Sequence, residues 1–193
     1  MKAKLIALMT GLLIVIVPAC GQKNEVSNYN YQKACEAFYD ENDDQKALEL
    51  LDKQLKENDR HADSYYLRAR IYYRADKNAA ALKDIKKAMQ YRNRQSQVYQ
   101  CTLYGLSGKI HFGMEMYDEA VSDFEKAAKL AKKEHKEAVQ GYKFELGQTY
   151  YNADKMEQAE EVYLDMLKDE PGDGAAMVGL SRNCLNRQSS SAS

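Results

Sequence analysis

The sequence predicts an all-α protein built as a solenoid of consecutive helix pairs. Its 193 residues include only two prolines, Pro18 and Pro171, and a long proline-free interior favours helices. Hydrophobic residues make up 45% of the chain, which is too many for a disordered protein. Four alanines recur in similar local sequences at spacings of 34, 39 and 39 residues: Ala47, Ala81, Ala120 and Ala159. A period in this range is typical of helical repeat arrays.

The charge and cysteine content narrow the class of protein. There are 28 Lys and Arg residues against 29 Asp and Glu, which gives a formal net charge of -1. A dedicated nucleic-acid binder needs a surplus of positive charge, so we expect no nucleic-acid partner. Four cysteines are too few for a disulfide scaffold.

The N-terminus has the pattern of an export signal. Lys2 and Lys4 precede an apolar run over residues 5–17, and Pro18, Ala19 and Cys20 follow it. A helix of this length spans roughly 20 Å, short of a hydrocarbon core of about 30 Å, so a transmembrane helix is disfavoured. A charged start, a short apolar centre and a small residue before the cleavage point indicate a secretory signal.

The four residues Val17-Pro18-Ala19-Cys20 resemble the lipobox of bacterial lipoproteins. The resemblance implies a signal peptide over residues 1–19, cleavage before Cys20 and lipidation of that cysteine. Residues 20–27 would then be a lipid-anchored tether. The protein would lie in the cell envelope, at the outer membrane rather than the inner, because Gly21 stands where inner-membrane lipoproteins carry Asp. The alternative is cleavage after Ala19 without lipidation, which would give a soluble exported protein.

The repeats can be superposed with the four alanines at position 20 of each copy. Small residues then align at position 8 and large, mostly aromatic residues at positions 4, 11 and 24. Position 8 holds Cys35, Ala69, Gly108 and Gly147; position 24 holds Leu51, Ile85, Phe124 and Tyr163. Over residues 28–173 this pattern resembles the tetratricopeptide repeat, in which small residues let two antiparallel helices approach and large side chains fill the remaining space.

The resemblance implies a right-handed α-solenoid of about four repeat-like helix pairs plus a C-terminal capping helix. The repeats are expected at about 28–61, 62–95, 101–134 and 140–173, the capping helix at 174–188 and a disordered tail at 189–193. A capping helix is needed because the last repeat otherwise exposes its apolar side.

Two local features are predicted within the array. Asp and Asn residues near 42–43, 76–78 and 152–154 are expected to end one helix and cap the next. Five extra residues fall near 96–100 and again near 135–139, and we expect both insertions to extend helices.

The sequence indicates no catalytic or metal site. The three histidines, His61, His111 and His135, lack metal-ligand spacing, and no cofactor motif is present. Packing explains Cys35 and Cys184 better than reactivity, because neither has an activating partner in the sequence. We therefore expect a protein that is not an enzyme and that binds no cofactor and no metal.

By the same resemblance, ligands would lie in the concave groove of the first helices, which positions 5, 9, 12 and 13 of each copy face. The candidate groove residues are Tyr39, Tyr66, Arg70, Tyr73, Arg74, Lys109, Phe112, Phe144, Gln148 and Tyr151. The aromatics could anchor an extended peptide or could pack between helices. Arg70 and Arg74, with Lys109, could grip an acidic motif, or could form weak rim pairs with Glu36 and Asp40.

Two functions follow from these features. The first is a lipid-anchored, non-catalytic scaffold of the cell envelope whose groove binds a protein or peptide partner. The alternative is an accessory lipoprotein in nutrient capture, with Tyr39, Tyr73 and Tyr151 stacking on a glycan or contacting a peptide.

Overall fold

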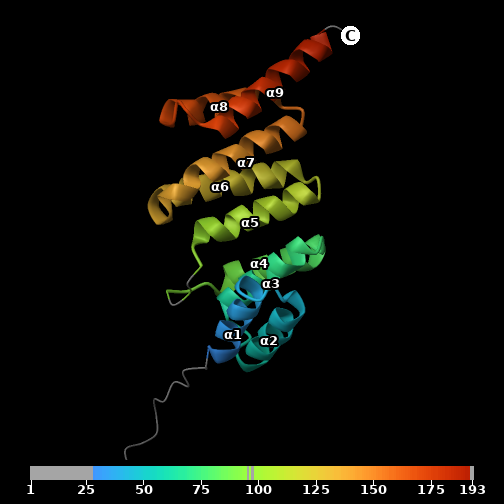
Figure 1. Ribbon diagram of the computed structural model, residues 1–193, viewed down its shortest axis with the longest axis vertical. Coiled ribbons are helices and arrows are strands. Elements are labelled where there is room, and N and C mark those ends of the chain that lie inside the picture. The colour runs from blue at the N-terminus through green and yellow to red at the C-terminus, as the bar shows by residue number, and fades with distance from the viewer. Residues whose placement is uncertain (1–27, 95, 97, 192–193) are drawn as a thin grey trace, which may run out of the picture.

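The computed structural model describes residues 28–94, 96 and 98–191, and this part of the chain is all-helical (Figure 1). The predicted signal peptide and tether, including Cys20, lie outside the described residues. In the described part, no helix combines the length and apolar character needed to cross a membrane.

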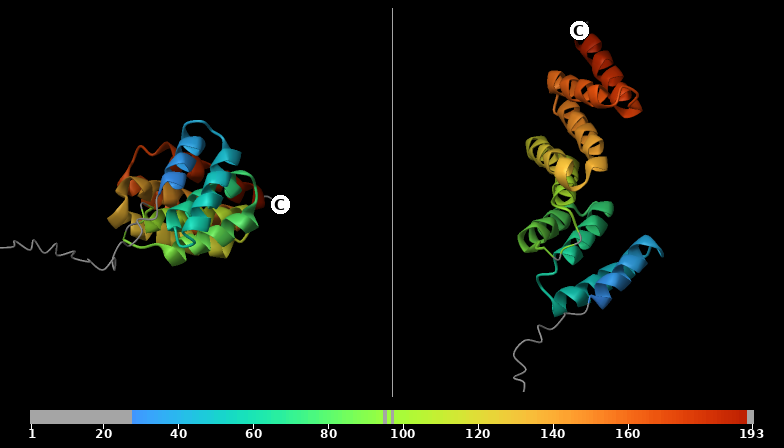
Figure 2. Two further views of the ribbon diagram at one scale, coloured as in Figure 1. Left: turned by 90° about the horizontal axis from the view of Figure 1, so that it is seen from below. Right: turned by 90° about the vertical axis from the view of Figure 1, so that its left-hand side faces the viewer.

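The helices form four consecutive pairs and one final helix, stacked along the long axis of the molecule (Figures 1 and 2). The pairs are α1 (Tyr29–Tyr39) with α2 (Asp44–Glu57), α3 (Ala62–Arg74) with α4 (Asn78–Tyr91), α5 (Gln100–Gly113) with α6 (Tyr117–Glu134), and α7 (Val139–Asn152) with α8 (Met156–Asp169). The final helix is α9 (Gly174–Ser191). The predicted all-α solenoid is confirmed.

The small residues at the repeated positions allow the close approach within each pair. All four alanines that set the period are completely buried. A Cβ atom placed on Gly108 would lie 2.8 Å from the ring of Phe124, and one on Gly147 would lie 2.6 Å from the ring of Tyr163. Each glycine therefore makes room for a large ring of the second helix in its own pair.

The turns inside the pairs use left-handed residues more than side-chain caps. Asn42, Asp76, Glu115 and Asp154 have φ between 53° and 59°, a conformation that Asn and Asp adopt more readily than most residues. Among the predicted caps, only the one in the first turn forms: the Asp43 carboxylate accepts the backbone N–H of Lys46 at 2.9 Å. The capping prediction was wrong for the second and fourth turns. There Asp76 and Asp154 adopt the left-handed backbone conformation, and no side chain caps the following helix.

The two insertions have different structures. The first lies in an irregular connection between α4 and α5, so the predicted helix extension there was wrong. Arg92 holds the two ends of this connection together, because its Nε donates to the carbonyl of Val98 at 2.9 Å. The second insertion follows α6, an 18-residue helix, and forms the short 3₁₀ helix η1 (Lys136–Ala138).

The C-terminal helix runs further than expected. We predicted a disordered tail from residue 189, but α9 continues to Ser191. No proline or glycine stands among residues 189–191 to stop the helix, and serine has a moderate helix propensity.

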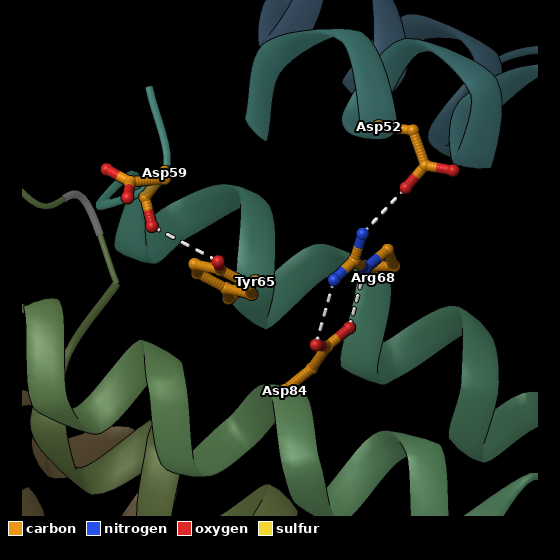
Figure 3. Close-up of polar contacts among 5 residues, drawn as sticks. All are labelled: Asp52, Asp59, Tyr65, Arg68 and Asp84. Carbon is orange, nitrogen blue, oxygen red and sulfur yellow. Dashed lines mark hydrogen bonds and ion pairs between the residues drawn. The ribbon is translucent and has the colours of Figure 1, made fainter. Parts of the chain in front are cut away.

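Arg68 forms a buried ion pair inside the second helix pair and an exposed one with the first helix pair (Figure 3). The guanidinium of Arg68 on α3 donates to both carboxylate oxygens of Asp84 on α4, at 2.6 and 2.9 Å, and to Asp52 on α2 at 2.6 Å. Nearby, the hydroxyl of Tyr65 donates to the carbonyl of Asp59 in the loop between the pairs. Arg68 thereby contacts both α2 and α4 from its position on α3.

Candidate functional site

The first helices of all four pairs contribute to one cleft of about 590 Å³. Helix α3 provides most of its polar lining, and α1, α5 and α7 close its sides. The lining residues are Phe38, Tyr66, Arg70, Tyr73, Arg74, Thr102, Gly105, Leu106, Lys109 and Tyr142. We call this surface the α3 cleft. Its mixture of aromatic rings and cations suits an extended ligand with both apolar and anionic groups.

One wall of the α3 cleft depends on a glycine. The ring of Tyr142 on α7 lies against Gly105 on α5, in space that a side chain at residue 105 would occupy. Burial raises the pKa of the Tyr142 hydroxyl to about 12, with nearby Cys101 also raising it, so this hydroxyl is protonated at neutral pH. Burial likewise raises the pKa of Tyr66 to about 12. Both phenols therefore stay neutral to a higher pH than an ordinary tyrosine.

Arg70 is the cation of the α3 cleft that lies among aromatic rings. Its guanidinium carbon lies 5.0, 5.3 and 5.9 Å from the ring centroids of Phe38, Tyr39 and Tyr66. Its Nη1 donates to the hydroxyl of Tyr39. No carboxylate among the described residues forms an ion pair with Arg70. Aromatic faces partly desolvate this guanidinium, which strengthens its attraction for an anionic group.

The other two cations of the cleft already have carboxylate partners. Arg74 donates to Asp44, at the start of α2, and to the side chain of Asn42. Lys109 pairs with Glu145 on α7 at 2.8 Å. The expected rim pairs of Arg70 with Glu36 and of Arg74 with Asp40 do not form, because Glu36 pairs with Lys33 on its own helix and Arg74 reaches the second helix of the first pair.

The structure gathers half of the candidate groove residues in the α3 cleft and disperses the others. Tyr66, Arg70, Tyr73, Arg74 and Lys109 line the cleft. Tyr39 borders it through its bond to Arg70. The others lie outside its lining: Phe112 packs with Tyr117, Phe144 and Tyr151 pack on the core of the fourth pair, and Gln148 accepts from Asn152 through its carbonyl. Of the three tyrosines considered for glycan stacking, only Tyr73 lines the cleft.

Sequence reasoning missed five lining residues: Phe38, Thr102, Gly105, Leu106 and Tyr142. Gly105 gave a usable signal, because a glycine at position 5 of a first helix leaves space that a neighbouring ring can occupy. Tyr142 follows the second insertion, so the repeat register alone did not place it in the groove.

Outside the α3 cleft, the histidine, cysteine and buried carboxylate side chains that could take part in chemistry make packing or hydrogen-bond contacts instead. Asp123, which is buried on α6, accepts from the hydroxyl of Ser107 at 2.6 Å and lies 2.9 Å from Nδ1 of His111. Burial raises the pKa of the Cys35 and Cys101 thiols, which makes both poor nucleophiles at neutral pH. Among the described residues, no cluster of His, Cys, Asp and Glu side chains could hold a metal ion.

Comparison with protein families identifies the repeats. Residues 62–95 and 102–134 match the tetratricopeptide repeat. These segments cover the second helix pair and all but the first two residues of the third, which is about a third of the chain. No curated protein sequence matches the chain.

Solved structures show the same fold. The chain is similar to YrrB, described as a TPR protein with an unusual peptide-binding site, with 17% identity, a TM-score of 0.68 and coverage of 86% of this chain and 80% of that one. It is similar to MamA 41-end from Desulfovibrio magneticus RS-1, with 12% identity, a TM-score of 0.72 and coverage of 85% and 86%. It is also similar to Pseudomonas aeruginosa pilF, with 15% identity, a TM-score of 0.67 and coverage of 86% and 70%. The chain contains tetratricopeptide repeats and has the fold of a tetratricopeptide-repeat solenoid.

Proposed function

Proceeding from this tetratricopeptide-repeat fold, we propose that the chain is a non-catalytic scaffold of the cell envelope that binds an extended segment of a partner protein in the α3 cleft. A lipid on Cys20 would hold it at a membrane, the outer one in preference to the inner. The fold supports protein binding, and the N-terminal pattern of residues 1–20 supports the anchor.

The observation that carries the binding proposal is the convergence of four first helices on one cleft. Aromatic rings of α1, α3 and α7 lie around it, with Lys109 of α5 at its edge. Buried aromatic and arginine side chains supply most of the binding energy in protein interfaces. An extended peptide can use rings supplied by several helices, whereas the three tyrosines suggested for glycan stacking do not meet in this structure. The arrangement therefore favours a peptide ligand.

Arg70 sets the chemistry of the preferred segment. Since Arg74 and Lys109 already have carboxylate partners, a carboxylate of the ligand gains most by pairing with Arg70. The surrounding rings favour an apolar or aromatic neighbour of that carboxylate. We expect the bound segment to combine an Asp or Glu side chain, or a terminal carboxylate, with adjacent apolar residues.

Crosslinking in cells of the native host tests this proposal. The full chain is crosslinked, purified and analysed by mass spectrometry, beside the variants Arg70→Ala, Arg60→Ala and Cys20→Ser. Arg60 is an exposed residue of the loop between α2 and α3 and serves as the matched control. We expect one abundant partner whose recovery falls at least ~10-fold with Arg70→Ala, about the loss of one charge-assisted contact, and is unchanged with Arg60→Ala.

The two parts of the proposal fail separately. Equal recovery of the partner with Arg70→Ala would remove the α3 cleft as the binding site. A chain that partitions into membranes equally with and without Cys20→Ser, and incorporates no labelled fatty acid, would remove the lipid anchor while leaving the binding site untouched.

A further inference from the structure

Basic residues gather in two short segments of the chain. Residues 83–94 and 126–137 together contain ten Lys and Arg residues and only three acidic ones, although the whole chain has 28 basic and 29 acidic residues. The segments are the C-terminal parts of α4 and α6 with the residues that follow each helix. Neither segment contributes to the lining of the α3 cleft, so they form a separate charged surface.

The three acidic residues of these segments are already engaged. Asp84 is buried against Arg68, and Glu134 accepts the backbone N–H of Cys101 at 2.9 Å. Glu137, the third, lies 3.1 Å from a neighbouring histidine nitrogen. The basic residues around them therefore keep a surplus of positive charge.

Most of the lysines have no carboxylate partner. Within the part of the chain that the structure describes, five of them form no ion pair: Lys83, Lys86, Lys129, Lys133 and Lys136. The helix dipole favours cations only in the last turn of a helix, and three of these five precede that turn. The dipole therefore does not account for the charge, which is available to an external anion.

The two basic segments lie at the same edge of the solenoid. Tyr99, just before α5, stacks on His135 at the end of α6, with ring centroids 5.5 Å apart and ring planes 13° from parallel. Tyr99 is 47% exposed. The starts of α5 and α7 and the end of α6 lie together on the left in Figure 1. We call the surface of residues 83–94, Tyr99 and residues 126–137 the basic edge.

The described chain begins at this edge as well. The two helices of each pair are antiparallel, so α1 starts on the side where the second helices end (Figure 1). The proposed tether over residues 20–27 would therefore leave from the side of the basic edge. Eight extended residues span at most about 29 Å, so a lipid on Cys20 would keep this edge close to a membrane surface.

This orientation would leave the α3 cleft accessible. Tyr39 and Arg74 are the last residues of α1 and α3, so they lie toward the opposite edge of the solenoid. A partner protein could reach the cleft from the side away from the membrane.

We propose that the basic edge rests on a surface of anionic phospholipid headgroups. The inference depends on the proposed anchor at Cys20 for its orientation, and charge complementarity selects the occupant, because clusters of Lys and Arg are attracted to anionic lipids. Tyrosine is enriched at the level of the headgroups, where the exposed Tyr99 would lie. At the same edge α2 and α8 carry both signs of charge, so the contact is centred on the second and third pairs.

The chain contains no tryptophan, so a single introduced one can report the contact. Tyr99→Trp places the reporter at the basic edge, and Met114→Trp places it at the opposite edge, where Met114 is 38% exposed after α5. Each full chain is purified from membranes of the native host in detergent. It is then reconstituted into phosphatidylcholine vesicles with or without phosphatidylglycerol. A nitroxide on the headgroup of some phosphatidylcholine molecules quenches any tryptophan at the membrane surface.

We expect the quenching of Tyr99→Trp to be at least ~2-fold stronger in vesicles that contain phosphatidylglycerol. The difference should disappear near 1 M salt, where the Debye length is about 3 Å. Met114→Trp should give the same low quenching in both kinds of vesicle. Adding Lys133→Glu to Tyr99→Trp should lower its quenching at least ~2-fold. Lys77→Glu, which reverses an exposed cation before α4 at the opposite edge, should not change it.

The possible outcomes separate this inference from the anchor. Quenching of Tyr99→Trp that is independent of phosphatidylglycerol, or absent from both kinds of vesicle, would overturn the inference whether or not the chain carries a lipid. An acidic protein or a nucleic acid that copurifies with the chain and is lost with Lys133→Glu would, in the absence of quenching, assign the basic edge to that partner instead. A chain without attached lipid that still shows salt-sensitive quenching would remove the anchor and retain the basic edge.

Discussion

At the scale of single residues, Arg68 combines a largely buried side chain with two carboxylate partners. It lies between α2 and α4 and donates to carboxylates on both, and the rings of Tyr65 and Tyr72 lie near its guanidinium. Burial alone would lower the pKa of Arg68, but the hydrogen bonds and charge of Asp84 outweigh it and raise the pKa. The guanidinium therefore remains charged in a half-buried position.

Replacing Arg68 should therefore be costly. Arg68→Ala would leave the Asp84 carboxylate, which is 3% exposed, without its partner. Removing one member of a buried ion pair costs about 3–5 kcal/mol, and we expect a loss of this size in urea unfolding monitored by circular dichroism. Asp52→Ala is the control, because Asp52 is exposed and its pair with Arg68 should contribute less than about 1 kcal/mol. Similar losses for both variants would contradict this account.

His61 gives the protein a pH-dependent stability. Its Nδ1 accepts the backbone N–H of Ser64 at 3.2 Å and caps α3, and its ring packs on Tyr31. Burial lowers the pKa of His61, with nearby Asp63 opposing the shift. Because the unfolded chain binds the proton more readily, the contribution of His61 to stability is present above its ordinary pKa of about 6.5 and is lost as pH falls toward the folded-state pKa.

His61→Asn should reduce this dependence. Asparagine retains a capping oxygen and does not titrate in this range. We expect the melting temperature of the unchanged chain to fall between about pH 7.5 and pH 5.5, the range around the ordinary histidine pKa, and that of His61→Asn to fall less. His135→Asn changes an exposed histidine and should behave like the unchanged chain. A steeper fall with His61→Asn would show that burial does not control this group.

At the scale of helices, the pairs depend on the contrast between small and large residues. The rings of Phe124 and Tyr163 lie against Gly108 and Gly147. In the third and fourth pairs, the absence of a side chain at these glycines therefore sets the distance between the two helix axes. Gln54 departs from this pattern, because it is a polar residue at a buried position. It is completely buried where the later repeats have Ala88, Ala127 and Met166, and its Oε1 accepts the backbone N–H of Tyr31 at 3.2 Å.

Two glycine substitutions test this requirement. Gly108→Ala would place a methyl group 2.8 Å from the Phe124 ring, and overpacking of this kind costs about 1–3 kcal/mol. Gly141→Ala is the matched control, because Gly141 lies near the start of α7 with no other atom within 4 Å of the added Cβ. There the better helix propensity of alanine should raise stability by up to about 1 kcal/mol in thermal unfolding. Stabilisation by both substitutions would show that Gly108 is not needed for close approach.

At the scale of the whole molecule, the core is a series of clusters that share helices. One cluster joins α1, α2 and α3, and the next joins α3, α4 and α5. Two more connect α5, α6 and α7 with one another and α7 and α8 with α9. Each interior first helix therefore belongs to two clusters, which is why a single pair would not be stable alone. The same arrangement lines up the first helices and creates the α3 cleft.

The sequence by itself determined the all-helical class, the period of the repeats and the small and large positions that face each other within a pair. These features depend on which residue types recur and at what spacing, and both can be read from the sequence. It also indicated the cations and several aromatics of the groove, because first-helix positions repeat.

Only the tertiary structure decided which of those residues act together. Arg74 pairs with Asp44 and Lys109 with Glu145, so Arg70 is the cleft cation with no carboxylate partner in the part of the chain that the structure describes. These pairings depend on the stagger between helices. The first insertion became a loop because packing between neighbouring pairs sets the connection, and no local pattern specifies it. The exposure of Met177, Val178 and Leu185 on α9 could not be predicted for the same reason, because exposure depends on which helices pack against α9, and the residue spacing within α9 does not specify them.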